Sequence, residues 1–116
     1  MPRWKIYSHP HDDILKEIVL TADKLMQIRN FIGQPITIVS GWRSPEYNTL
    51  IGGSRFSYHC KGMAADFYVE GWDCDDLRDS LEPHLADWKI RMENLPGSTW
   101  VHIDRGSVVN KRYFKP

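Results

Sequence analysis

The chain has 116 residues, of which 41% are hydrophobic, and its 15 acidic and 15 basic side chains give a formal net charge of zero. This length and apolar content suit one compact domain spanning residues 1–116, whose core needs no disulfide support. The zero net charge argues against nucleic acid as a partner, because long-range attraction to phosphate is missing, and no stretch approaches the roughly 20 apolar residues that a membrane span requires.

The first segment, residues 1–5, lacks the apolar core of a signal peptide, so we expect a protein that is cytoplasmic as synthesised. From Asp12 to Phe31, apolar residues recur at three- and four-residue steps, which predicts an amphipathic helix. Gly33 and Pro35 supply its stop signal, since glycine tolerates the left-handed cap conformation and proline cannot continue a helix.

Two short segments, both predicted to be strands, flank a long loop. Pro35–Ser40 is rich in β-branched residues, and Ala64–Val69 is a second apolar run closed by a glycine. Between them, Gly41–Lys61 contains many turn-forming residues and no sustained period, which indicates a long structured loop. Loops of this length in a compact domain usually carry function, because ordering them costs entropy.

The last part of the chain predicts one more helix and two strands. Leucines at four-residue steps indicate a helix over Asp75–Leu85. Trp88–Met92 and Thr99–Asp104 alternate as strands do, and the turn Asn94–Gly97 joins them. Together these elements predict an α+β fold in which helices pack on one face of a small, mainly antiparallel sheet.

Three side chains in these segments are candidate metal ligands: His59, Asp66 and His102. Two imidazoles and one carboxylate suit catalytic zinc, which takes three protein ligands and leaves the fourth position for water. In the last predicted strand, His102 points away from the apolar Val101 and Ile103, toward the face left free for function. A histidine or aspartate in a strand is more often an ordinary hydrogen-bonded group, so both interpretations stay open on spacing alone.

Three blocks of the sequence resemble a known family. Ser57–Asp66 matches all six specified positions of the S-x-H-x-x-G-x-A-x-D signature of zinc D-Ala-D-Ala carboxypeptidases and L-Ala-D-Glu endopeptidases. This peptidase M15-like family shares its fold with hedgehog signalling domains. Ser40–Asn48 is similar to the family's S-G-x-R-S-x-x-x-N block, and Trp100–Asp104 to its closing H-x-D strand.

The resemblance implies a hedgehog/DD-peptidase-like fold and specific roles. Zn²⁺ is expected to be bound by His59, Asp66 and His102. Arg43 is expected to hydrogen-bond the substrate carbonyl and to stabilise the oxyanion, because its charge is fixed and its donors form a planar fork; the alternative is a surface salt bridge. Ser57 is expected to line the site and contact the peptide substrate.

The general base is where this sequence departs from the family. Many relatives have a glutamate or histidine two or three residues before the last zinc histidine, but here those positions hold Trp100 and Thr99, and neither accepts a proton. Glu93, the nearest upstream carboxylate, is predicted to be the base if a hairpin brings it near the metal. Asp104 is the alternative, or else it holds the orientation of the His102 imidazole.

The function implied by the resemblance is that of a zinc metallopeptidase acting on peptidoglycan stem peptides, either a D-Ala-D-Ala carboxypeptidase or an endolysin-type endopeptidase. We expect it to act as a monomer on the cell wall, and the missing leader favours a phage-encoded enzyme. Two alternatives stay open: a catalytically weak or inactive zinc-binding module, and a phage structural component with the same fold. Cys60 and Cys74 are expected to stay reduced.

Overall fold

The computed structural model describes residues 10–54, 57–109 and 111–116 of the chain. Residues 1–5, in which the sequence predicts no signal-peptide core, lie outside the described residues. The described helices are α1 Asp12–Ile32, α2 Pro45–Leu50, α3 Cys74–Leu81 and α4 Leu85–Trp88, with 3-10 helices at Tyr58–Lys61 and Glu82–His84. The strands are β1 Thr37–Ser40, β2 Ala64–Tyr68, β3 Arg91–Glu93, β4 Val101–Asp104 and β5 Tyr113–Phe114. None of the described helices has the length and apolar composition needed to cross a lipid bilayer.

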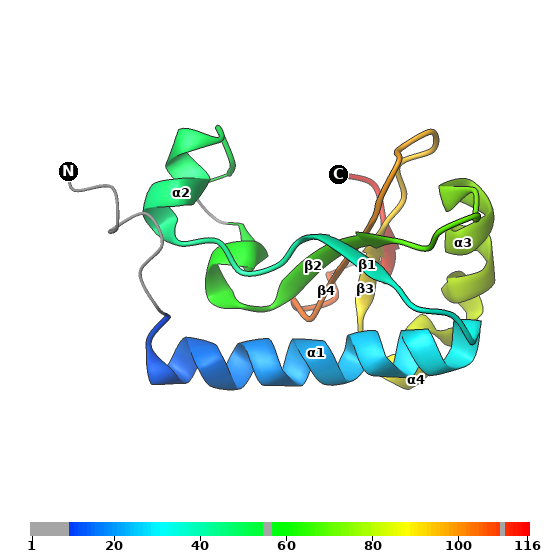
Figure 1. Ribbon diagram of the computed structural model, residues 1–116, viewed down its shortest axis with the longest axis horizontal. Helices are drawn as coiled ribbons and strands as arrows, with labels where there is room; N and C mark the ends of the chain where they lie inside the picture. Colours follow the sequence, from blue (N-terminus) through cyan, green and yellow to red (C-terminus); the bar gives the residue numbers. More distant parts are fainter. Residues whose placement is uncertain (1–9, 55–56, 110) are drawn as a thin grey trace.

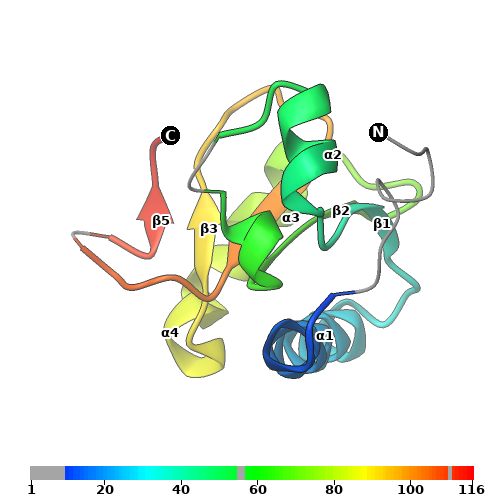
Figure 2. The same ribbon diagram turned by 90° about the vertical axis from the view of Figure 1, so that its left-hand side faces the viewer.

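The described strands form one sheet in the order β1-β2-β4-β3-β5. Neighbouring strands pair antiparallel, except that β3 and β5 run parallel. Helix α1 runs beneath the sheet and α4 lies on the same side, whereas α2 lies on the opposite side (Figure 1; Figure 2). The predicted α+β fold with a mainly antiparallel sheet is confirmed.

The central strands β2 and β4 separate the core from the opposite face of the sheet by simple alternation. Their apolar residues form part of one buried cluster with α1: Ala65, Phe67, Val101, Ile103 and Ile28. Because successive side chains of a strand point to opposite faces, the residues between them face away from α1. The face of the sheet opposite α1 is therefore left for polar side chains.

Helix α1 confirms the predicted element, and its carboxyl end has the expected glycine cap. Gly33 adopts a φ of 76°, and its N–H donates to the carbonyl oxygen of Arg29. Only part of the predicted apolar face is covered, because Leu15, Val19 and Met26 are about half exposed. The helix packs on the core through a narrow stripe that includes Ile28.

The segment predicted as one loop, residues 41–61, contains two short helices, so this part of the prediction is wrong. Helix α2 begins after Ser44, whose hydroxyl accepts a hydrogen bond from the N–H of Tyr47, and Pro45 lies in its first turn. Both features favour a helix start. With six residues, α2 is shorter than two turns and cannot produce a detectable period.

The 3-10 helix Tyr58–Lys61 is anchored on α1 at its carboxyl end. Gly62 follows it with a φ of 73°, and a Cβ there would lie only 2.9 Å from Cγ1 of Ile18. The hydroxyl of Thr21 donates to the carbonyl oxygen of Gly62 at 2.7 Å. Glycine is thus needed for both the backbone conformation and the close approach. This contact holds the turn that carries His59.

The helix predicted over Asp75–Leu85 ends at Leu81. Pro83 interrupts it, because proline lacks the N–H that would continue the helical hydrogen bonds, and a 3-10 helix and α4 follow. Helix α4 extends into the strand predicted at Trp88–Met92, which begins only at Arg91. The sequence does not predict β5, since a two-residue strand shows no alternation.

Arg78 is a buried cation, 2% exposed, that holds the segment before β4. Its guanidinium donates to the carbonyl oxygens of Trp100 at 3.0 Å and Ser98 at 3.3 Å and pairs with the carboxylate of Asp75. We expect Arg78→Met to lower the free energy of unfolding by about 1–3 kcal/mol, because two partly buried backbone carbonyls lose their donor. Urea denaturation followed by circular dichroism measures this change. In the control Arg29→Met, on exposed α1 surface, the shift should stay below about 0.5 kcal/mol, and equal losses would refute the role of Arg78.

Candidate metal centre

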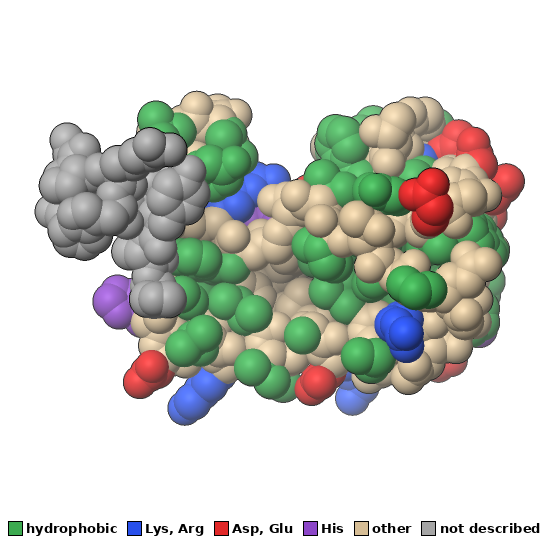
Figure 3. Space-filling model, viewed as in Figure 1, with side chains coloured by type: hydrophobic (Ala, Val, Ile, Leu, Met, Phe, Trp, Pro, Cys, Tyr) green, Lys and Arg blue, Asp and Glu red, His purple; other side chains and the backbone are tan. Residues whose placement is uncertain are grey.

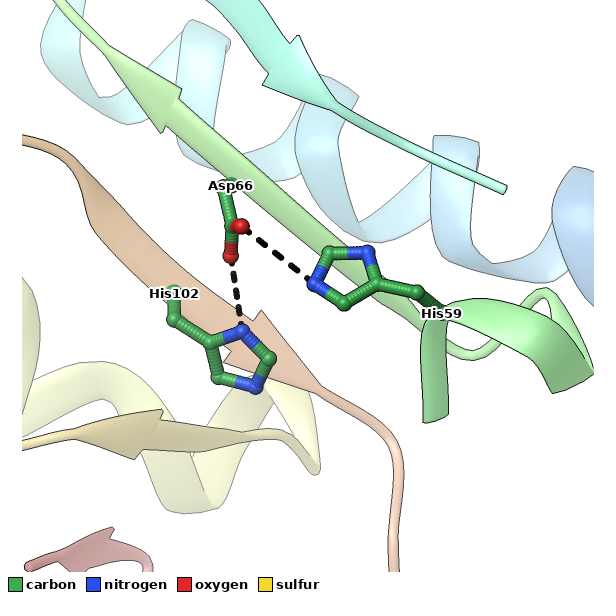
Figure 4. A group of neighbouring side chains, drawn as sticks. All are labelled: His59, Asp66 and His102. Atoms are coloured by element: carbon green, nitrogen blue, oxygen red, sulfur yellow. Dashed lines mark hydrogen bonds and ion pairs between the residues drawn. The ribbon is translucent and has the colours of Figure 1, made fainter. Parts of the chain in front are cut away.

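Three side chains from distant parts of the chain converge on the sheet face opposite α1. His59 comes from the 3-10 helix, Asp66 from β2 and His102 from β4, and the β2–β4 register pairs Asp66 directly with His102. Figure 4 shows both imidazoles beside the Asp66 carboxylate, with Nε2 of His59 3.3 Å from Oδ2 and Nδ1 of His102 2.7 Å from Oδ1. Their candidate ligand atoms all lie within 4.8 Å of one another, so they could hold one metal ion.

The surface above the sheet is concave. In Figure 3 a hollow separates α2 from the rest of the upper surface, and histidine and Lys or Arg side chains lie in it. His59 and Asp66 are 4% and 6% exposed, whereas the side chain of His102 is 16% exposed. The three candidate ligands are thus largely withdrawn from water, while one of them still reaches the surface.

In each imidazole, the ring nitrogen that does not contact Asp66 lies within hydrogen-bond distance of an acceptor oxygen. Nδ1 of His59 lies 2.8 Å from the carbonyl oxygen of Gly41, which can only accept, so this nitrogen carries the hydrogen. Nε2 of His102 lies 3.0 Å from Oδ2 of Asp104 and donates to that carboxylate. The lone pairs of a neutral His59 and a neutral His102 then point at Asp66, which is the orientation that metal ligation requires.

The charges of the group match a site for a cation. Burial raises the pKa of Asp66, but its polar contacts with His102 and His59 outweigh burial and hold that pKa well below its usual range. Burial disfavours the charged form of His102, yet hydrogen bonds to Asp104 and Asp66 raise its pKa to about 9. Without a metal, a protonated His102 therefore lies between two carboxylates, and a divalent cation can replace its proton.

Asp104 holds the His102 ring and is itself held by Arg91. Asp104 is 1% exposed, and Arg91 binds both of its oxygens, at 2.6 and 2.9 Å. Oδ1 also accepts from the N–H of Gly106, and Oδ2 from His102. Both oxygens are engaged, which argues against Asp104 as a general base. Arg91 was not predicted from the sequence, although alternation with Glu93 in the same strand places it on this face.

Arg43 lies beside the group, as the resemblance implies. Its Nη2 is 3.6 Å from Oδ2 of Asp66. Its Nε donates to the hydroxyl of Ser40 at 3.0 Å and its Nη1 to Oδ1 of Asn48 at 3.3 Å. The backbone N–H of Arg43 donates to the carbonyl oxygen of His59. Ser40, Arg43 and Asn48 of this block therefore form one hydrogen-bond network that fixes the guanidinium.

The other two predicted site residues, Ser57 and Glu93, differ in their contacts with the three candidate ligands. The hydroxyl of Ser57 accepts the N–H of His59 at 3.2 Å, so it holds the turn that carries this ligand. Extending the β3–β4 register by one residue places Glu93 across from His102, on the same face of the sheet. Among the described residues, no hydrogen bond or ion pair joins Glu93 to the three candidate ligands. The role of Glu93 stays a prediction.

Sequence comparison finds relatives over most of the chain. A family model described as Peptidase M15 matches residues 6–104. The chain is 32% identical over 91 residues to the peptidoglycan L,D-endopeptidase MepK of Escherichia coli K12, and equally to MepK of Shigella flexneri. These alignments cover 72% of this chain and 48% of each relative, so the chain spans about half the length of the curated relatives it matches.

A solved structure has a similar fold. The LdcB LD-carboxypeptidase, described for its recognition of peptidoglycan, superposes with a TM-score of 0.54 at 23% sequence identity. The match covers 83% of this chain and 63% of that chain. At this identity the likeness establishes the arrangement of helices and strands, and the chemistry has to be argued from the site.

Proposed function

The chain belongs to the peptidase M15 family, and on this basis we propose that it is a zinc-dependent peptidase that hydrolyses peptide bonds in bacterial peptidoglycan. The observation that carries the proposal is the convergence of His59, Asp66 and His102 with both imidazole lone pairs directed inward. The similarity to an L,D-endopeptidase favours cleavage within peptides or cross-links over removal of a terminal residue.

The donor set fits zinc. His59, Asp66 and His102 would hold the ion, because two imidazoles and one carboxylate are ligands that zinc prefers, and three protein ligands leave a position open. Bound in such a site, zinc acts as a Lewis acid that polarises a carbonyl and lowers the pKa of a water to roughly 7. Asp104 keeps the ring of His102 in the ligating orientation, and Arg91 keeps Asp104 in place.

Two further residues act on the substrate in this proposal. The oxygen of water adds to the scissile carbonyl carbon, the C–N bond then breaks, and the leaving amine takes up a proton. Glu93 accepts the proton of the attacking water and passes it to that amine. Arg43 donates to the carbonyl oxygen as negative charge develops there, and Ser40 and Asn48 hold its guanidinium ready, so little reorganisation is needed.

The direct test is hydrolysis of purified peptidoglycan by zinc-loaded protein, with products identified by mass spectrometry. We expect new amino termini to appear, to vanish after chelation and to return with added zinc. The products also distinguish an endopeptidase from a carboxypeptidase. Stoichiometric zinc without cleavage would favour a zinc-binding module instead, and protein that binds no zinc would contradict the proposal. The phage origin, location and monomeric state expected from the sequence stay predictions.

The raised pKa of His102 predicts how zinc binding depends on pH. Because this pKa is about 9 in the folded protein, above its usual 6.5, a proton competes with zinc at neutral pH. Zinc binding should release about one proton from His102, and the apparent affinity should rise up to about tenfold per pH unit until pH 9. Calorimetric titration in buffers of different ionisation enthalpy measures the released proton.

The same shift has a consequence for stability. A raised folded-state pKa contributes stability that is fully present below pH 6.5 and is lost as the pH rises through 9. The metal-free protein should therefore lose this contribution in alkali, while the zinc-loaded protein, whose His102 is already neutral, should not. A gap in Tm between the two forms that does not widen between pH 6.5 and 9 would contradict a protonated His102.

A further inference from the structure

A basic pocket lies next to the candidate metal centre. It has a volume of about 410 Å³ and is lined by Arg91, Val109, Lys111, Phe114 and Lys115. Three of these five side chains are cationic, although the whole chain has zero net charge. The pocket is therefore a local concentration of positive charge, formed by β3 and the carboxyl-terminal segment that contains β5.

Phe114 and Arg91 connect this pocket to the metal group. The ring of Phe114 packs edge-on against the ring of His102, with centroids 6.3 Å apart. The guanidinium carbon of Arg91 lies 4.2 Å from the centroid of the Phe114 ring. Arg91 also binds Asp104, which holds His102. The pocket thus borders the third candidate ligand.

The positive charges of the pocket are not equivalent. Arg91 is paired with the buried carboxylate of Asp104, so its charge is already balanced. Lys111 and Lys115 are exposed, and within the described parts of the chain neither has a hydrogen bond or an ion pair. Glu93 lies across from Phe114 in the β3–β5 register but joins neither lysine in the described structure. The ammonium groups of Lys111 and Lys115 can therefore both bind an anionic ligand.

We propose that this pocket binds a carboxylate of the peptide substrate. Lys111 and Lys115 supply the positive charge, and Phe114 and Val109 pack against the aliphatic carbons that carry the carboxylate. A carboxylate matches this combination, because its one negative charge suits flexible ammonium donors and its short apolar stem suits the flanking surface. The inference rests on the proposed peptidase function, since peptidoglycan stem peptides carry carboxylates at the chain end and on side chains.

Amidated substrates test this inference. A synthetic stem tetrapeptide containing diaminopimelate is offered in four forms: with all carboxylates free, and with the chain-end carboxylate, the side-chain carboxylate of diaminopimelate or the free carboxylate of glutamate amidated. We expect Lys111→Gln/Lys115→Gln to reduce kcat/KM about tenfold for the free form, mainly through KM. The reduction should disappear for whichever amidated form lacks the recognised carboxylate, which identifies the carboxylate bound.

A matched control removes two charges elsewhere. Lys16 and Lys24 lie on α1, which packs on the other face of the sheet. The variant Lys16→Gln/Lys24→Gln should keep kcat/KM within about twofold of that of the unmodified protein. All variants should bind zinc as the unmodified protein does. Equal losses on the free and on all three amidated peptides, or no loss at all, would overturn the inference.

Calorimetric binding of the same peptides to the zinc-loaded protein separates failure of the pocket from failure of the proposed function. If the unmodified protein cleaves none of the peptides, the peptidase proposal fails. The pocket is then judged by binding alone. Weaker binding of one amidated peptide, with no further weakening in Lys111→Gln/Lys115→Gln, supports the pocket. Equal binding of free and amidated peptides refutes it.

Discussion

Replacing His102 with alanine is expected to abolish zinc binding and peptide hydrolysis together. His102 provides one of three ligands, and its loss leaves two ligands and an excess of negative charge at Asp66 and Asp104. We expect kcat/KM to fall by at least about 10³-fold, as when a member of a catalytic unit is removed. Zinc content after exhaustive dialysis, measured by atomic emission, should fall from equimolar to near zero.

One control for the His102→Ala variant tests whether it folds, and another removes a histidine that lies outside the metal group. Far-ultraviolet circular dichroism shows whether His102→Ala keeps its secondary structure, and if it does not, His59→Gln tests the same group with less change in volume. His11→Ala, at the exposed amino end of α1, should keep both zinc and turnover. A folded His102→Ala protein with equimolar zinc and unchanged hydrolysis would refute the metal centre.

The sequence allowed two of the three candidate ligands to be placed on one face of the sheet, because positions in a strand follow local rules, whereas their role as ligands came from the resemblance to the peptidase family. Asp66 and His102 alternate with apolar residues along single strands, so their face follows from the pleat alone. The register that pairs these two strands is then constrained, because a shift by one residue would expose the apolar side chains to solvent. The helix α1 was predictable for the same reason, since its period and its Gly33 cap are local signals.

The hydrogen-bond networks around the ligands were harder to predict, because they join segments that are distant in sequence. Arg91 reaches Asp104 only once β3 and β4 pair, and no local pattern marks an arginine as the partner of a buried carboxylate. Helix α2 and β5 were missed because each is too short to show a period. Local patterns therefore place residues on the faces of helices and strands, but they do not show which residues pair across two elements.

The two faces of the sheet have different roles: the face toward α1 stabilises the fold, and the opposite face carries the candidate metal ligands. Phe67 and Val101 pack toward α1, while Asp66 and His102, their neighbours in the same strands, face the hollow surface. Substitutions on the two faces should therefore differ in kind: those toward α1 lower the free energy of unfolding, and those toward the hollow change zinc affinity or turnover. A test of Glu93 as the general base depends on this separation between effects on stability and effects on the site.

Changing Glu93 to glutamine is expected to leave zinc binding intact and to reduce kcat by about 10²–10⁴-fold, the contribution typical of a general base. Glutamine keeps the size and polarity of the side chain but cannot accept the proton of the attacking water. Glu93 reaches the site face through the β3–β4 register, and it forms no ion pair with the candidate ligands in the described residues. Zinc affinity should therefore be insensitive to the change.

Two other carboxylates make this result interpretable. Glu70→Gln, at an exposed position after β2, should leave both kcat and zinc affinity unchanged. Asp104→Asn should behave in the opposite way to Glu93→Gln: because Asp104 orients the ring of His102, its loss should weaken zinc affinity about 10–100-fold. If Glu93→Gln retains full kcat while Asp104→Asn loses turnover at saturating zinc, the base is Asp104, and its engagement with Arg91 must then break during the reaction.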